Sequence, residues 1–330
     1  MFAVSVPRSG APHPLPEGYR LRAAEPEDRA AVAALMAAVD VDEYGVAETT
    51  EDDIAEAWAR PRFDLAHDAW VVLAPDGTLA GYGDIWDPEP HVDFDLDPWV
   101  AVGHPRDIER TLLDIAERRA REHLPLAPPD AEVVLHSVRS SVDTEGLAQL
   151  EQLGWEVVRI YLRMVIDLGE TVPQPQTPPG VEVRPLRLGV DDAVAQATIE
   201  EAFAEHFRHP RVTLEEFRAR HLGEHFAPDL CLLAWDGDVC AAALLGLEEA
   251  DDTGRKGWIR ELGVRRPWRG GGLGMALLHH AFGRFAARGL RRVELGVDAD
   301  NPNATRLYER AGMRAERAYV FSARTLQAGG

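Results

Sequence analysis

Two periodic patterns of apolar residues alternate along this chain, and their order appears twice. In the first half, runs that alternate apolar and polar positions predict strands at 19–23, 70–74, 79–86, 98–102, 132–138 and 155–168. Apolar positions at helical spacing predict helices at 26–39, 50–59, 107–122 and 144–153. In the second half the strands are at 181–186, 230–235, 239–247, 258–264, 292–297 and 318–323, and the helices at 191–207, 213–221, 274–288 and 303–310. Both halves therefore follow one order, β-α-α-β-β-β-α-β-α-β.

The repeat keeps a nearly constant offset. Landmarks recur 158 to 162 positions later: Arg22 and Arg184, Asp76-Gly77 and Asp236-Gly237, Pro105 and Pro267, Gly154 and Gly312. A constant offset at several landmarks indicates an internal duplication. The segment between the halves holds four prolines, which favour an extended linker. We therefore expect a domain at 1–168, a linker at 169–180 and a domain at 181–330, each domain a mixed α/β sheet flanked by helices.

Composition narrows the class of partner. The 330 residues carry a formal net charge of −21, which argues against binding nucleic acid or an anionic membrane. No apolar run reaches the ~18 residues of a membrane span, and residues 1–18 lack a signal-peptide core, so the expected location is cytoplasmic. Lys256 is the sole lysine, an arginine bias that suggests a bacterial genome. Cys231 and Cys240 lie in apolar runs and are expected to be buried in the core.

The chain's most informative stretch is 259–275, I-R-E-L-G-V-R-R-P-W-R-G-G-G-L-G-M. A strand runs into a basic turn, then into three consecutive glycines, and then into a helix. The amides at a helix N-terminus and the helix dipole favour anions, and glycines let a phosphate approach the backbone closely. Arg265, Arg266 and Arg269 add positive charge. The stretch therefore predicts a phosphate site.

Together with its downstream sequence, this stretch resembles the GCN5-related N-acetyltransferase (GNAT) family. The matching residues are Leu262-Gly263-Val264, the R-x-x-G-x-G motif from Arg269 to Gly274, Asn303-x-x-x-x-Tyr308 and Gly312-Met313. The resemblance implies two tandem GNAT folds and acetyl-CoA as cosubstrate. It implies coenzyme contacts from a strand, a loop and a helix: Leu262, Gly263, Val264, Arg269, Gly270, Gly271, Gly272, Leu273, Gly274, Met275 and Asn303.

The same resemblance implies two catalytic residues, Tyr308 and Glu261. Tyr308 would protonate the departing thiolate, and Glu261 would take a proton from the incoming ammonium, a group that is mostly charged at neutral pH. From the residues alone, Tyr308 could equally be a core tyrosine, and Glu261 a surface glutamate paired with Arg260 or Arg292. Glu248, Glu249 and Asp298, near the same strand ends, are weaker candidates for the base. His206 and His209 follow the first helix of the second half and are candidates for the substrate wall or the surface.

The first half lacks these features. Its loop at 103–109 is three residues shorter, has no glycine cluster and carries two acids. By the offset, Tyr308 corresponds to Leu150, Asn303 to Glu145 and Glu261 to Trp99. We therefore expect a degenerate first domain that does not catalyse.

The expected reaction is direct acetyl transfer to a small-molecule amine in a ternary complex, by a monomer or homodimer. The tandem layout also resembles that of the mycothiol synthases, which acetylate a cysteinyl pseudodisaccharide. The alternatives are a non-catalytic acetyl-CoA sensor and an acetyltransferase that acts on proteins. This mechanism requires no metal, and no Cys/His cluster has the spacing of metal ligands.

Overall fold

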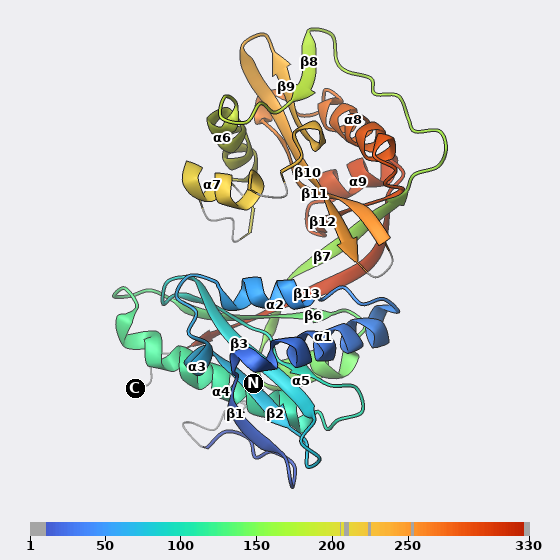
Figure 1. The fold of residues 1–330 in the computed structure, drawn as a ribbon. Helices are drawn as coiled ribbons and strands as arrows, with labels where there is room; N and C mark the ends of the chain where they lie inside the picture. Colours follow the sequence, from blue (N-terminus) through green and yellow to red (C-terminus); the bar gives the residue numbers. More distant parts are fainter. Residues whose placement is uncertain (1–10, 205, 208–210, 224–225, 252–253, 327–330) are drawn as a thin grey trace, which may run out of the picture. The chain divides into compact units, whose positions relative to one another are not determined.

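The computed structural model describes residues 11–204, 206–207, 211–223, 226–251 and 254–326 (Figure 1). The chain forms two compact units. Unit 1 comprises residues 1–160 and 319–330, and unit 2 comprises residues 161–318. None of the helices in the described ranges has the length and apolar character that a membrane span requires.

The predicted elements of each half occur in the expected order, and the first half contains two further short elements. The first half contains β1 (Arg20–Ala23), α1 (Arg29–Tyr44), α2 (Glu51–Trp58), α3 (Leu65–Asp68), β2 (Ala69–Leu73), β3 (Leu79–Glu89), β4 (Asp93–Leu96), β5 (Trp99–Val100), α4 (Asp107–His123), β6 (Val133–Ser140), α5 (Thr144–Gln152) and β7 (Glu156–Asp167). The second contains β8 (Val181–Pro185), α6 (Asp192–Phe203), α7 (Leu214–His221), β9 (Cys231–Asp236), β10 (Val239–Asp251), β11 (Gly254–Val264), α8 (Leu273–Ala287), β12 (Arg292–Asp298), α9 (Pro302–Arg310) and β13 (Arg314–Leu326).

The sheet of unit 2 is buried on both faces. Its strands follow the order β7-β12-β11-β10-β9-β8, with β11 and β12 parallel and the other pairs antiparallel. Helices α8 and α9 cover one face and α6 and α7 the other (Figure 1). Leu232 and Leu244 pack under α8, while their neighbours Leu233 and Leu245 pack under α6. Burial on both faces explains why β9 and β10 are continuous apolar runs rather than alternating ones.

Each unit takes its last strand from the other half of the sequence. In unit 1 the strand order is β1-β2-β3-β4-β6-β13, and β13 pairs antiparallel with β6 from Tyr319↔Ser140 to Leu326↔Val133. In unit 2, β7 pairs antiparallel with β12 from Arg292↔Asp167 to Asp298↔Tyr161. Leu326 accordingly lies in the core of unit 1, and Met164 in that of unit 2.

This strand exchange moves the boundaries away from the expected 1–168 and 181–330. Residues 161–168 belong with the second half, and residues 319–330 with the first. The sequence could not indicate the exchange, because the apolar pattern of a strand does not specify which of two sheets it joins. A cut in the linker at 169–180 would leave each unit without one strand, so the experiments below use the full chain.

The two halves also share an Arg–Asp ion pair at equivalent positions, as an internal duplication predicts. The Arg22 guanidinium donates two hydrogen bonds to Asp28, at 2.6 and 2.7 Å, and Arg184 donates two to Asp191, at 2.7 and 3.1 Å. Such bidentate pairs fix the strand to the start of the following helix in both halves.

The last helices also begin alike. In α5 the side chain of Asp143 accepts from the Gly146 amide, and in α9 the side chain of Asn301 accepts from the Ala304 amide. Asp and Asn are among the preferred N-cap residues, so both helices begin at equivalent positions for the same physical reason.

Two short elements were not predicted. Strand β4 reads D-F-D-L, in which Phe94 and Leu96 are buried while the two aspartates are not. Asp is depleted in strands, so a four-residue run that is half Asp gives a weak strand signal. Helix α3 is a single turn capped by Asp64, too short for a periodic pattern. The strand expected at 98–102 is reduced to β5, which pairs with β3 through two residues.

Candidate active site

The parallel strands β11 and β12 of unit 2 separate part-way along their length. They pair at Gly257↔Val293, Trp258↔Glu294 and Ile259↔Leu295. Beyond Ile259 the β11 ladder continues on its other side only, against β10, as far as Ala242↔Val264. The register between β10 and β11 shifts at Leu245/Gly246, opposite Arg260, and such bulges bend a strand. Residues 260–264 therefore form an edge of β11 that β12 does not cover.

The hydrogen bonds of β11 show which of its backbone N–H and C=O groups face β10 and which face the gap. The Arg265 amide donates to the Ala241 carbonyl of β10 at 3.0 Å. Since the N–H and C=O groups of successive residues point to opposite sides of a strand, Gly263 faces β10, and Leu262 and Val264 face away from it. Leu262 and Val264 were expected to contact the coenzyme, and their backbones point into the gap between the two strands. An extended amide chain can pair with such an edge.

The glycine loop leads from this edge to α8. Gly270 and Gly272 have φ angles of +79° and +86°, in the left-handed region that glycine adopts without strain. Gly272 is the N-cap of α8, and its lack of a side chain leaves the first turn of the helix without a side-chain cap. The first amide that bonds back within the helix is that of Ala276, to the Gly272 carbonyl at 3.0 Å. The loop Gly270 to Gly272 is exposed, so an anion has access to the helix N-terminus.

Arg265 and Arg269, near the loop, are each held by protein groups. Arg269 donates from Nε to the Val264 carbonyl at 2.9 Å and from a terminal nitrogen to the Ala202 carbonyl at 3.1 Å. Arg265 pairs with Glu201, which offsets its charge. Arg269 thus fixes the loop against the end of β11, which is a positioning role. Its guanidinium is still exposed, and the expected coenzyme contact remains a prediction.

The remaining predicted coenzyme residues divide into packing and surface positions. A Cβ on Gly263 would lie 2.8 Å from Cβ of Ala202, so the close approach of α6 is one reason for glycine there. Leu273 is buried in the core, and Gly271, Gly274 and Met275 line the loop and the first turn of α8. Asn303 is exposed and accepts a hydrogen bond from Arg306 at 3.0 Å. The N-cap of α9 is Asn301, so Asn303 does not cap this helix.

Glu261 and Tyr308 lie near each other at the separated strands. Tyr308, on α9, is 7% exposed, and Glu261, on β11, is half-buried. Burial raises the pKa of the Glu261 carboxyl to about 7, an increase that Arg220 and Arg260 reduce and Glu200 reinforces. Burial, and then the negative charge of Glu261, raise the pKa of the Tyr308 phenol well above its usual value. At neutral pH the phenol therefore keeps its proton, while the carboxyl can take one up or release it.

Comparison with known proteins identifies the family of the chain. Residues 194–313 match the Acetyltransferase (GNAT) family. The chain is 33% identical over 249 residues to the mycothiol acetyltransferase of Geodermatophilus obscurus, covering 73% of this chain and 77% of that protein. It is also 33% identical to a GCN5-related N-acetyltransferase from Sphaerobacter thermophilus, whose crystal structure superposes with a TM-score of 0.83 over 96% of this chain and 98% of the other.

The chain belongs to the GCN5-related N-acetyltransferase family. It is a tandem member, an acyl-CoA-dependent N-acetyltransferase that uses acetyl-CoA. A tandem GNAT protein from the clavulanic acid biosynthesis pathway shares its fold, with a TM-score of 0.70 at 17% identity over 94% of this chain and all of that one. The predicted family, the duplicated α/β fold and the class of enzyme are thus confirmed.

The other carboxylates near the acetyltransferase site are less suited to act as the base. Glu248 pairs with Arg255 and Arg288, and the hydrogen bond from Arg255 is the main reason that its pKa is lowered. Burial raises the pKa of Glu249, but Glu249 lies opposite Lys256, toward the far end of β10 and away from the separated strands. His206 is exposed and contacts Phe203, and His209 lies outside the described residues.

In unit 1 the counterpart of the phosphate loop is filled by a network of ion pairs. Glu109 is 1% exposed and accepts hydrogen bonds from Arg106 and Arg139, both at 3.0 Å. Arg106 also pairs with Asp143, the cap of α5. Leu150, which replaces Tyr308, is fully buried. The cations that could attract a phosphate are therefore already paired with carboxylates, which supports the prediction that the first half does not catalyse.

Proposed function

We propose that this acetyltransferase moves the acetyl group of acetyl-CoA to a primary amine of a small molecule at the separated strands of unit 2. The observation that carries the proposal is the end of the β11–β12 ladder at Ile259, beyond which β12 does not cover the Leu262 backbone and the Val264 amide, near Glu261 and Tyr308. The coenzyme's amide-containing arm would pair with this edge. Its pyrophosphate would bind the amides from Gly270 to Gly274, at the N-terminus of α8.

The residues then suit a direct transfer. Glu261, as a carboxylate, takes one proton from the acceptor ammonium, and the free amine attacks the thioester carbon. The carbon–sulfur bond breaks, and the Tyr308 phenol donates its proton to the leaving sulfur. Tyr308 regains a proton from the nitrogen of the tetrahedral intermediate, directly or through water. The net result is one amide and one free thiol. Of the two protons that leave nitrogen, one ends on sulfur, and the other is held by Glu261, which releases it to solvent before the next turnover.

A second, narrower candidate concerns the acceptor. Several curated relatives are named mycothiol acetyltransferase, including those of Geodermatophilus obscurus and Salinispora arenicola, the latter 33% identical over 76% of this chain. This favours a cysteinyl pseudodisaccharide as the acceptor.

A panel of acceptors tests both proposals. The full chain is incubated with acetyl-CoA and either the cysteinyl pseudodisaccharide, its analogue without the sugars, or simple primary amines, and products are detected by mass. An acetylated amine supports the transferase proposal, and a preference of at least about 100-fold in kcat/KM for the pseudodisaccharide supports the narrower one. Acetyl-CoA that binds without acetylating any amine would contradict the general proposal.

Glu261→Gln tests the base. Because the carboxyl must be ionised to accept a proton and its pKa is about 7, kcat/KM of the wild type should rise with pH through about 7 and then level off. The amide cannot accept the proton, so we expect a loss of roughly 10²-fold at pH 8 and no ionisation near pH 7 in the profile. Glu249→Gln is the matched control, since it removes another half-buried carboxylate, and should keep the wild-type profile. An unchanged profile in Glu261→Gln would assign the base to another group.

A further inference from the structure

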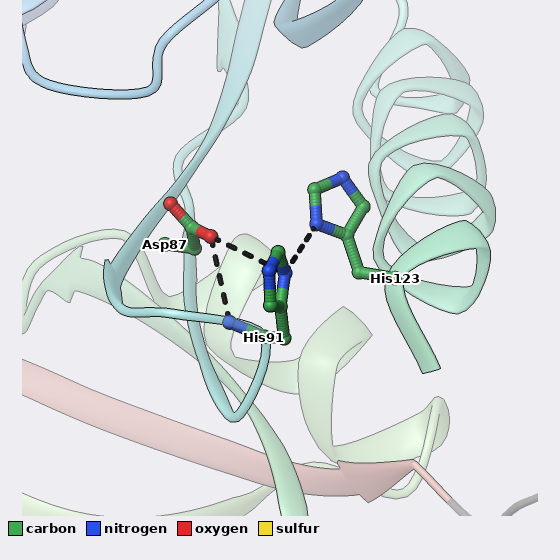
Figure 2. Close-up of side chains that lie close together, drawn as sticks. All are labelled: Asp87, His91 and His123. Carbon is green, nitrogen blue, oxygen red and sulfur yellow. Dashed lines mark hydrogen bonds and ion pairs between the residues drawn. The ribbon is translucent and has the colours of Figure 1, made fainter. Parts of the chain in front are cut away.

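Three side chains of unit 1 converge away from the residues assigned to catalysis (Figure 2). Asp87 lies near the end of β3, His91 in the turn that follows, and His123 is the last residue of α4. One carboxylate oxygen of Asp87 and one ring nitrogen from each histidine all lie within 4.8 Å of one another. Three possible ligand atoms, from a strand, a turn and a helix, therefore lie close enough together to bind one metal ion.

The local backbone holds two of these side chains in place. Asp87 lies where the register between β3 and β4 shifts, between Trp86 and Glu89, and bulges of this kind redirect a side chain. His91 has a φ of +63°, an uncommon left-handed conformation for a residue other than glycine. Its backbone amide lies 3.4 Å from Oδ2 of Asp87, which closes the turn around the carboxylate. This backbone brings His91 back over the strand that carries Asp87.

The two imidazoles face each other through the same atom. Nδ1 of His91 lies 3.1 Å from Nδ1 of His123, and Figure 2 shows the two rings turned toward one another. Two nitrogens bound to one tetrahedral Zn²⁺, at about 2.0–2.1 Å each, lie roughly 3.3 Å apart. Oδ2 of Asp87 lies 3.8 Å from Nδ1 of His91, a separation that two ligands of one ion can also have. The distances among these three atoms would need to change little for all of them to bind one metal ion.

The charges around the three residues also suit a cation. Arg62 donates to Oδ1 of Asp87 at 3.2 Å and to its backbone carbonyl at 2.6 Å, which leaves Oδ2 directed at the histidines. The nearby Arg119 is neutralised by Asp68 and Glu122, at 2.8 and 2.9 Å. With the histidines neutral, the two arginines and three carboxylates carry a net charge of −1. A divalent cation would therefore enter a slightly negative site.

From this geometry we propose that Asp87, His91 and His123 form a Zn²⁺ site, with water completing the coordination. Two imidazoles and one carboxylate are a donor set that Zn²⁺ and its first-row neighbours prefer. The rings of Phe94 and His123 pack nearly perpendicular to each other, with their centroids 5.5 Å apart, and a pocket lined by Phe63, Ile85 and Phe94 adjoins the site. The ion would tie the turn after β3 to the end of α4. Its role in unit 1 would be to stabilise the fold, apart from acetyl transfer.

The test is a Zn²⁺ titration of the full chain, with any affinity tag removed and bound metals stripped by a chelator. We expect one equivalent of Zn²⁺ to bind, Co²⁺ to give the visible absorption of a tetrahedral site, and Zn²⁺ to raise the melting temperature. His91→Ala/His123→Ala should weaken Zn²⁺ binding at least about 100-fold and abolish the shift in melting temperature. Asp87→Asn, which is nearly isosteric, should weaken binding while the protein remains folded.

The matched control is His67→Ala. His67 and Asp64 form another His–Asp pair of unit 1, at 2.9 Å, without a third ligand in the described part of the chain. Its loss should leave the stoichiometry and the affinity for Zn²⁺ unchanged. The proposal is overturned if the wild type takes up no Zn²⁺, or if the double variant binds it as tightly as the wild type. In either case the two Nδ1 atoms share a single proton in a histidine–histidine hydrogen bond.

Discussion

Tyr308→Phe is expected to lower kcat by about 10²- to 10⁴-fold while the KM for acetyl-CoA stays within about twofold. The substitution removes one oxygen and keeps the ring, so the buried contacts of α9 persist. The variant loses the proton donor for the leaving sulfur. This donor stabilises the transition state and does not contribute to the binding of acetyl-CoA. The phenol is suited to this role because burial and Glu261 hold its pKa above its usual value, and it remains protonated over the working pH range. Steady-state kinetics at saturating acceptor measure the effect.

Tyr82→Phe is the matched control for that experiment. Tyr82 is also a buried phenol, 2% exposed, but it lies on β3 of unit 1, where it accepts from Trp58 and donates to Asp84, each at 2.9 Å. Its replacement should lower the melting temperature, because two partly buried partners lose a hydrogen bond, and should leave kcat near the wild-type value. Equal kcat values for Tyr308→Phe and the wild type would remove Tyr308 from the chemistry.

Gly272→Asp is expected to raise the KM for acetyl-CoA by roughly 100-fold or more. The new carboxylate would cap the first turn of α8 and occupy the amides that the pyrophosphate needs. Losing two hydrogen bonds to a charged group, at about 1.5 kcal/mol each, corresponds to about that factor. Gly272→Ala separates strain from charge, since it adds only a Cβ at a φ of +86°. We expect it to raise this KM less than Gly272→Asp does.

Gly289→Asp provides the control at the other end of the same helix. Gly289 follows α8, is exposed, has a φ of +80°, and has no atom within 4 Å of an added Cβ, which is also true of Gly272. The two substitutions therefore introduce the same strain and the same charge. Only the one at the N-terminus should change the KM for acetyl-CoA, and a similar increase in both variants would mean that the effect comes from general destabilisation.

The sequence predicted those parts of the site that depend on local chemistry. Gly270 and Gly272 adopt positive φ angles, a backbone conformation that favours glycine. Such a position can be recognised in the sequence because glycine occupies it. Tyr308 and Glu261 could be named because the motifs around them resemble those of the GNAT family. How the two lie relative to each other depends on the fold, and in the structure the Glu261 charge adds to the effect of burial in raising the Tyr308 pKa.

Features that depend on contacts between distant segments were not predicted. The exchange of β7 and β13 pairs residues more than 120 positions apart, and no local pattern distinguishes one sheet from the other. The group of Asp87, His91 and His123 was missed for the same reason, because its third member is 32 residues from its second and the ligands include a carboxylate. Both buried cysteines, by contrast, followed from apolar context alone.

The most direct test of the account is the crystal structure of the full chain with acetyl-CoA, together with the binding stoichiometry in solution. The account predicts one acetyl-CoA per chain. Its pyrophosphate should lie against the amides from Gly270 to Gly274, and its thioester between β11 and β12 beyond Ile259, within reach of Tyr308. Two molecules per chain, or a single one bound in unit 1 at Arg106 and Glu109, would contradict the assignment of catalysis to the second half.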